Sequence, residues 1–185
     1  KGEYFTWLNS DDMFCPGSLA QLVERIERRD RNWYAANMVY IDEKSNIVRC
    51  CRSGSFERFL LKFGVLNVFG PSTIFHRDIF MKVGPLRKDF HYCMDTEYWW
   101  RVVSSGIQYT RIPIFLWALR LHDDSKTTST IISGMKKAPL QMSEEVQAVR
   151  RAYFPDVGKE KKKVGILIAR MYRVVPLSYV YSYFS

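Results

Sequence analysis

The stretch GPSTIFHRDIFMKVGPLRKDFHYCMDTEYWWRVVSSG, residues 70–106, decides the fold. Its apolar spacing predicts a strand over residues 72–76, a short helix over 77–83 and a longer helix over 95–105. Gly84 follows the first helix and Gly106 the second, and glycine readily takes the left-handed conformation in which helices commonly end. The stretch is therefore a strand followed by two helices, with a charged or polar segment before the second helix.

The alternation of strands and helices continues on both sides of this stretch. Upstream, the sequence predicts a short buried strand over residues 3–8, a loop over 9–16, and a helix whose apolar positions include Leu19, Leu22, Val23 and Ile26. The other elements that we expect are strands over 33–41, 47–52, 107–112 and 115–121, helices over 55–63 and 128–153, and a last helix from Val164 that follows a basic linker, 159–163. This order indicates an α/β fold.

An acidic loop follows the first predicted strand. The stretch WLNSDD, residues 7–12, places Asp11 and Asp12 next to each other, with Asn9 two residues before Asp11. Mg²⁺ prefers oxygen ligands and takes one or two carboxylates, so the loop is a candidate metal site. Asn, Ser and Asp are also common turn residues, and a turn without a ligand is the alternative.

A second polar stretch, LRLHDDSKT, follows the last predicted strand at residues 119–127. Arg120, His122 and Lys126 would place two cations and an imidazole close together, and such groups offset the charge of a phosphate. The alternative is that His122 is a structural or exposed residue of the loop.

The helix predicted over residues 95–105 begins with an acidic residue and carries an ion-pair pattern. Asp95 has two interpretations, a reactive carboxylate or a cap that accepts hydrogen bonds at the helix N-terminus. Glu97 and Arg101 are spaced i, i+4 and predict an ion pair that supports the helix. Tyr98, Trp99 and Trp100 cannot all face one way, so at least one of them belongs to the core.

Taken together, these motifs resemble those of family-2 glycosyltransferases of the GT-A type. Residues 8–19, LNSDDMFCPGSL, are similar to the metal-binding region of that family, although Asn9 stands where many members have Asp. Residues 70–106 are similar to its acceptor-side segment, and Arg120, His122 and Ser125 fit its R-x-H-x-x-S pattern. The three motifs occur in the order of the family, and the resemblance covers residues 2–127.

The resemblance implies a role for each motif. Asp11 and Asp12, with His122, would hold Mg²⁺ or Mn²⁺ at the two phosphates of the donor, where Asn9, Arg120, His122 and Lys126 would also bind. Asp95 would be the general base that deprotonates the acceptor hydroxyl. The residues implied on the acceptor side, or just behind it, are Gly70, Ser72, Glu97, Trp99 and Arg101.

The resemblance also implies a fold and an activity. Residues 1–127 would be the C-terminal part of a GT-A domain, a Rossmann-like mixed sheet without the N-terminal half that binds the nucleotide base. The activity would be an inverting transfer of a sugar from a UDP-sugar to a glycan or lipid-linked acceptor, in cell-surface glycan or polysaccharide synthesis. An inactive fragment is the alternative.

Residues 128–185 form a basic, helical extension in this interpretation. Residues 1–130 carry 18 Lys and Arg against 15 Asp and Glu, whereas residues 131–185 carry 10 against 4, so most of the net charge of +9 lies in the extension. Residues 159–185 suit an anionic membrane surface; packing on the catalytic domain or on a second subunit is the alternative. Another alternative for the whole chain is a basic membrane-binding module.

Cysteine use and aromatic spacing limit the setting and the partners. Cys15, Cys50, Cys51 and Cys93 form no C-x-x-C pair, so we expect reduced thiols in a cytoplasmic protein, held at the inner face of the membrane by its extension. The aromatic residues fall mostly at core periods rather than among basic residues, which argues against a nucleic-acid partner.

Overall fold

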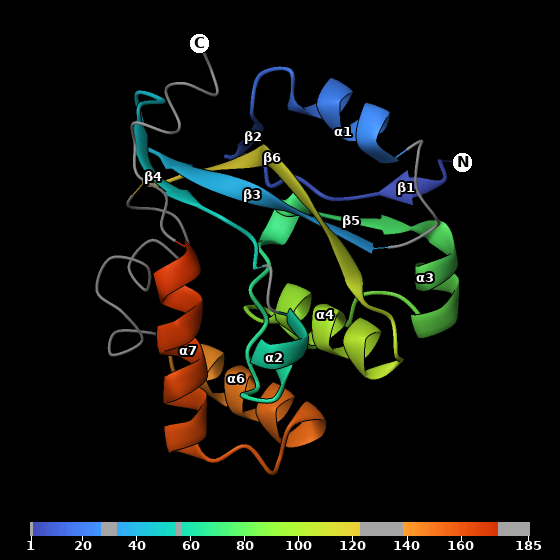
Figure 1. Cartoon of the computed structure of the whole chain (residues 1–185), viewed down its shortest axis with the longest axis vertical. Coiled ribbons are helices and arrows are strands. Elements are labelled where there is room, and N and C mark those ends of the chain that lie inside the picture. Colours follow the sequence, from blue (N-terminus) through green and yellow to red (C-terminus); the bar gives the residue numbers. More distant parts are fainter. Residues whose placement is uncertain (1, 27–32, 55–56, 123–138, 174–185) are drawn as a thin grey trace.

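A computed structural model describes residues 2–26, 33–54, 57–122 and 139–173. Its centre is a curled, mixed six-stranded sheet with helices on both faces, so the α/β fold is confirmed (Figure 1). The strand order is β1-β5-β3-β6-β2. Off this path, β4 pairs with residues 38–41 of β3, whereas β5 pairs with residues 33–35. Among the described strands only β3 and β6 run parallel. The strands are β1 (Tyr4–Phe5), β2 (Met13–Phe14), β3 (Trp33–Ile41), β4 (Ile47–Cys51), β5 (Thr73–His76) and β6 (Tyr109–Arg120).

The strand β6 is continuous where the sequence predicts two strands. Pro113 lacks a backbone N–H and would interrupt a regular ladder. In the structure the register between β3 and β6 shifts between Ala35 and Asn37, opposite residues 111 and 115, so that Pro113 lies in a bulge and is exposed. The bulge lets one strand pass the proline and carry on to Arg120.

The N-terminal segment also differs from the prediction. The strand predicted as buried over residues 3–8 is reduced to the two-residue β1, which is half-buried at the sheet edge and pairs with β5. The loop predicted over residues 9–16 contains β2, which pairs with β6 through Met13 and Phe14. Both differences depend on partners far along the chain, which a local pattern does not report.

The two faces of the sheet are covered by different helices, as Figure 1 shows. On one face lies α1 (Ser18–Ile26), where Leu22 and Ile26 pack against the sheet while Leu19 and Val23 are exposed. On the other lies α4 (Met94–Ser104), where Tyr98 and Trp99 pack on Trp33 of the sheet. The remaining elements of this part are α2 (Glu57–Leu61), the 3₁₀ turn η1 (Gly70–Ser72) and α3 (Arg77–Val83).

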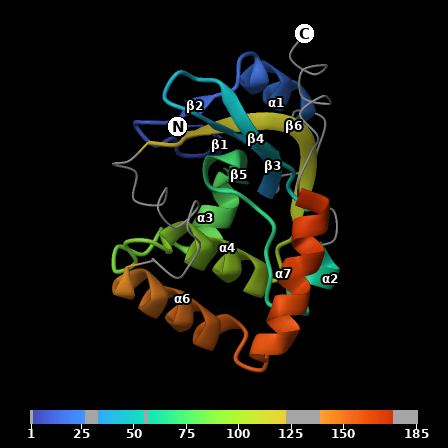
Figure 2. The ribbon, with the colours of Figure 1, turned by 90° about the vertical axis from the view of Figure 1, so that its left-hand side faces the viewer.

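Two further helices pack below α4. Figure 2 shows α6 (Leu140–Tyr153) beneath α4, and α7 (Lys159–Arg173) rising beside both toward the sheet. The basic run 159–163 is thus the first turn of a helix and not a linker, in keeping with the good helix propensity of Lys and Glu. Gly165 fixes the docking of α7, because a Cβ there would lie 2.3 Å from the Cβ of Phe63. Residues 128–138 of the predicted helix 128–153 lie outside the described residues.

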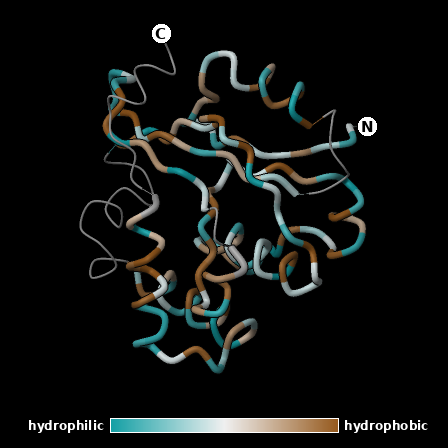
Figure 3. The backbone as a smooth tube through the Cα atoms, in the orientation of Figure 1, coloured by the Kyte–Doolittle hydropathy of each residue, from teal (hydrophilic) through white to brown (hydrophobic). Residues whose placement is uncertain are grey.

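The hydropathy of the chain follows this layering. Figure 3 shows hydrophobic residues along the strands and the inward side of the helices, with hydrophilic residues toward the ends of the elements. All four cysteines are buried and free, and Cys50 and Cys51 belong to different core clusters on β4. In the part of the chain that the structure describes, no helix is long and apolar enough to cross a bilayer.

Candidate functional site

A cavity of about 540 Å³ joins the acidic loop to the start of α4. Four of the site residues predicted from the sequence line it: Asn9, Gly70, Asp95 and Trp99. Asn9 follows β1, Gly70 opens η1, and Asp95 and Trp99 lie on α4, so the fold brings three distant segments to one hollow. The cavity volume falls in the range of about 300–1,000 Å³ that small-molecule sites occupy.

Asp95 lies in the first turn of α4 and is half-buried in this cavity. Its Oδ1 accepts hydrogen bonds from Thr96, at 2.6 Å from the backbone N–H and 3.2 Å from the hydroxyl. The N-cap residue is Cys93, so Asp95 is not the N-cap itself, but it accepts a backbone N–H bond in the first turn, as the cap interpretation expects. Burial raises the pKa of Asp95 more than the Thr96 hydrogen bonds lower it. A raised pKa suits a carboxylate that must accept a proton.

The loop before Asp95 is held by a carboxylate that sequence reasoning missed. Glu145 of α6 is only 7% exposed, and its two oxygens accept the backbone N–H groups of His91, Tyr92 and Cys93 at 2.9, 2.8 and 2.8 Å. Burial alone would raise the pKa of Glu145, but these hydrogen bonds outweigh it and lower the pKa. No short-range signal in the sequence links Glu145 to a loop more than fifty residues earlier.

A second contact between α6 and α4 involves the predicted ion pair. Arg101 binds both oxygens of Glu97, at 3.1 and 2.9 Å, and also donates to the carbonyls of Val83 and Pro85. Glu97 is 1% exposed and accepts a further bond of 2.6 Å from the hydroxyl of Tyr153 on α6, while burial and that bond raise the pKa of Tyr153 to about 12. Neither Glu97 nor Arg101 lines the cavity, so both act on it through the position of α4.

The remaining acceptor-side residues form the wall of the cavity. The indole N–H of Trp99 donates to the Thr73 hydroxyl at 3.3 Å, which fixes the ring against β5. Gly70 leaves room for the ring of Trp117, since a Cβ at Gly70 would lie 3.1 Å from that ring. Ser72 is fully buried behind the wall and donates to the carbonyl of Asn37 at 3.0 Å. Tyr98, Trp99 and Trp100 are all buried, so the core takes more of this aromatic run than the prediction required.

The acidic loop meets the end of β6. His122 Nε2 lies 2.9 Å from Asp11 Oδ2, although the two residues are 111 positions apart. Asp12 is tied down: Oδ1 accepts from the Arg120 backbone N–H at 3.0 Å, and Oδ2 from the side-chain amide of Asn9 at 2.7 Å. The contact with His122 lowers the pKa of Asp11, whereas burial raises the pKa of Asp12. The first carboxylate is therefore the better candidate for a metal.

The donor set at this loop fits a divalent cation that is shared with a substrate. No group of three or more His, Cys, Asp or Glu side chains in the described part of the chain could hold a metal by itself. Mg²⁺, however, usually keeps water and binds substrate phosphates besides one or two protein ligands. Asp11, whose side chain is 39% exposed, and His122 would supply such a partial set.

Arg120 has a structural use that the sequence did not suggest. Its guanidinium donates to the carbonyls of Asp42 and Glu43 at 3.0 and 3.1 Å and to the Ser45 hydroxyl at 3.1 Å. These bonds anchor the turn between β3 and β4 beside the acidic loop, and diphosphate contact through Arg120 stays a prediction. Lys126 lies outside the described residues.

Comparisons with known proteins support the resemblance that the three motifs predict. No family model matches the chain. An uncharacterized glycosyltransferase of Rickettsia typhi is 24% identical over 145 residues, and one of Rickettsia prowazekii is 23% identical over 145 residues. Each match covers 74% of this chain and 45% of the relative, so the chain spans about half the length of the curated relatives it matches.

Among solved structures, the chain is similar to residues 1–349 of TarS from S. aureus. The TM-score is 0.46 and the identity 13%, with 91% of this chain and 54% of that one covered.

Proposed function

We propose that this chain is part of a metal-dependent glycosyltransferase that moves a sugar from a nucleotide diphosphate donor to an acceptor hydroxyl, with Asp95 as the base. The observation that carries the proposal is the 540 Å³ cavity, whose lining includes both Asp95, a carboxylate of raised pKa, and Asn9 of the acidic loop. The pathway that we propose is cell-surface glycan or polysaccharide synthesis.

On the acceptor side, Asp95 takes the proton of the attacking hydroxyl. As the hydroxyl oxygen forms its bond to the anomeric carbon, the bond to the diphosphate oxygen breaks on the opposite face, and the configuration inverts. The Oδ1 atom is engaged by Thr96, so Oδ2 is the oxygen that we assign to the acceptor. Trp99, one of the walls of the cavity, offers an aromatic ring beside it.

On the donor side, Asp11 and His122 are the residues that would hold Mg²⁺ or Mn²⁺. The ion would supply positive charge for the diphosphate that leaves. Asp12 and Asn9 hold the loop in shape through their mutual hydrogen bond and the Arg120 backbone. The donor that we propose is a UDP-sugar.

The test is Asp95→Asn in a protein that includes any residues upstream of Lys1, with Asp89→Asn as the matched control. Asp89 is an exposed carboxylate of the same region, and its partner is Arg87. We expect kcat to fall by about 10²–10⁴ in Asp95→Asn, the usual contribution of a general base. The dissociation constant of UDP with Mn²⁺, measured by calorimetry, should stay unchanged. Full turnover by Asp95→Asn would sink the assignment, and no turnover by the wild type would favour the inactive-fragment alternative.

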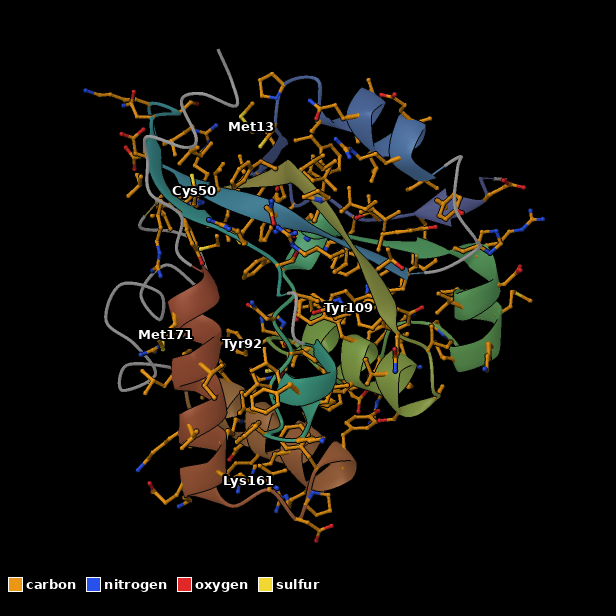
Figure 4. The ribbon with its side chains drawn as sticks, viewed as in Figure 1. Met13, Cys50, Tyr92, Tyr109, Lys161 and Met171 are labelled. Carbon is orange, nitrogen blue, oxygen red and sulfur yellow. The ribbon has the colours of Figure 1, made fainter. Side chains whose placement is uncertain are left out.

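We also propose that α7 lies on an anionic membrane surface at the cytoplasmic face. Val164, Leu167 and Met171 are 49%, 62% and 72% exposed and lie on one side of the helix, with Lys161 and Lys163 close by. Exposed apolar residues next to lysines are typical of helices in the interface plane. Figure 4 shows Met171 and Lys161 near opposite ends of this helix.

Co-sedimentation with anionic vesicles measures this second proposal. The triple change of Val164, Leu167 and Met171 to Ser should abolish binding, whereas neutral vesicles should bind the wild type weakly. A dimer that the same triple change converts to a monomer in light scattering would assign the surface to a second subunit instead.

A further inference from the structure

A second cavity, of about 380 Å³, lies between α4, α6 and α7. Its lining is largely apolar, with Val65 and Leu66 from the segment after α2, Val149 from α6 and Ile166 from α7. The three helices meet here side by side, as Figures 1 and 2 show together. The close contact of Gly165 with Phe63 sets the width of this gap, because no larger residue would allow α7 to approach so closely.

Among the described residues, this cavity is lined by cationic groups and by no carboxylate. Lys162 and Arg170, both on α7, line it, and no Asp or Glu is among the lining residues. Within the described ranges no carboxylate forms an ion pair with Lys162; its ammonium lies 5.3 Å from the centre of the Phe154 ring. Burial lowers the pKa of Lys162, and the positive charge of Arg150 lowers it further. An apolar hollow with Lys162 and Arg170 at its edge, and with no carboxylate among its described lining residues, is complementary to an apolar group that carries a negative charge.

The two faces of α7 differ in a way that identifies the occupant. One face carries the exposed stripe Val164, Leu167 and Met171, which suits the surface of a bilayer. The other face carries Lys162, Ile166 and Ala169, which line the cavity. A helix that lies on lipid with one side thus lines a hollow with the other, so a ligand that comes from the membrane has a short path to the cavity.

The second cavity also adjoins the Asp95 site. Val68, Thr96 and Trp99 line both cavities, so a single wall separates them. Thr96 is the residue whose backbone and hydroxyl bind Asp95. A ligand anchored in the second cavity would therefore be separated from Asp95, the carboxylate that we propose as the base, only by this shared wall.

We propose that the cavity between α4, α6 and α7 binds the apolar chain of a lipid acceptor, with its anionic head group at Lys162. The identification of this lipid as the acceptor rests on the proposed function, whereas the binding of an anionic amphiphile does not.

The binding test uses dodecyl phosphate below its micelle concentration, titrated into the 185-residue chain and followed by calorimetry. We expect binding of dodecyl phosphate, with inorganic phosphate and dodecyltrimethylammonium each weaker by about tenfold or more, since each lacks one half of the match. Equal binding of the cationic and the anionic amphiphile would overturn the charge assignment, and no binding of dodecyl phosphate would overturn the site.

Two substitutions and one control locate the ligand. Lys162→Met should weaken binding of dodecyl phosphate about tenfold, because it removes a partly desolvated charge but keeps the length of the side chain. Lys82→Met, at an exposed lysine of α3 that lines neither cavity, should change it less than twofold. Ala169→Phe, a buried position, should fill the cavity and block binding. Unchanged affinity in Lys162→Met would overturn the proposal even if Ala169→Phe failed to fold.

A kinetic arm separates this proposal from the proposed function. In the longer active protein, an acceptor with an alkyl chain should have a KM at least about tenfold lower than the same acceptor without it, and Ala169→Phe, which fills the place of the chain, should remove the difference while kcat is kept. Transfer that is indifferent to the chain would overturn the lipid acceptor alone. Amphiphile binding in a protein without any transfer would overturn the proposed function alone.

Discussion

The two sides of the candidate site are built differently. The Asp95 side is fixed by buried contacts within α4 and between α4 and α6: Glu145 holds the loop before Asp95, and Tyr153 and Arg101 hold Glu97, two residues after Asp95. The Asp11 side is a loop whose main link to the end of β6 is an exposed pair with His122. A base has to be in place before the acceptor arrives, whereas a partial donor set is completed by the diphosphate and its ion. We infer that the Asp95 side is the more rigid of the two sides.

The largest effect on stability should come from Glu145→Ala. Three buried backbone N–H groups would lose their acceptor, and a buried donor left unsatisfied costs about 1–3 kcal/mol, so the free energy of unfolding should fall by about 3 kcal/mol. Urea denaturation measures it. Glu144→Ala, its exposed neighbour on α6, is the control and should have almost no effect. Equal effects of the two changes would contradict the holding role of Glu145.

Glu145 should also make the free energy of unfolding decrease at acid pH. Its pKa is lowered in the folded chain, so its contribution is fully present above the unfolded value near 4.5 and is lost as the pH falls through the folded value. Hydrogen exchange of the His91–Cys93 amides, followed from pH 7 down to pH 3, should show protection that fades over this range. The Glu145→Gln variant should lack this pH dependence.

Tyr153→Phe should have a smaller effect of the same kind. It removes the 2.6 Å bond to Glu97 but leaves both bonds from Arg101, so we expect a loss of about 1 kcal/mol in urea denaturation. Tyr92→Phe serves as the control. A loss as large as that of Glu145→Ala would mean that α6 is held mainly at its C-terminal end.

Asp95→Asn should raise stability rather than lower it. Burial raises the pKa of Asp95, so ionising it at neutral pH costs the folded state free energy that the amide does not lose. The stabilisation should be present above the folded pKa and disappear as the pH falls toward the unfolded value near 3.8. Thermal unfolding at pH 7 and pH 4 measures it. A melting temperature of Asp95→Asn below that of the wild type at pH 7 would contradict an environment that disfavours the ionised carboxylate.

Asp11→Asn should change stability least. The pair with His122 is exposed, and such pairs are worth about 0–1 kcal/mol. Binding of UDP in the presence of Mn²⁺ should nevertheless be lost, because the amide adds no charge. Asp12→Asn should lower stability more but affect UDP binding less, since the Asp12 carboxylate fixes the loop through Arg120 and Asn9. Loss of binding only in Asp12→Asn would reverse the assignment of the ligand.

Local patterns predicted the elements that depend on near neighbours. The strand β3 and the helices α3 and α4, with Gly84 and Gly106 at positive φ after them, agree with the sequence to within a residue or two. The strand β2 was missed because its pairing with β6 is set by residues about a hundred positions away. The break expected in β6 at Pro113 is absorbed by a bulge that only the partner strand reveals.

The candidate site shows the same division. The motifs named Asp95 and grouped Asp11 with His122, which do lie in contact, but they did not indicate that Asp12 faces the backbone of Arg120. Glu145 carried no signal at all, because a single Glu in an amphipathic helix is most often a solvated residue. Its role depends on a loop that it reaches only in the folded chain.

The position of Glu145 in the chain has a consequence for biosynthesis. Every strand of the sheet has left the ribosome once Arg120 has emerged, so the sheet can assemble before α6 exists. The carboxylate oxygens of Glu145 reach the His91–Cys93 amides only after the residues between Arg120 and Glu145 are made. This delay is on the order of seconds at about 5–20 residues per second. During that interval we expect a sheet without a fixed His91–Cys93 loop, and the synthesis of α6 is the step that fixes the start of α4.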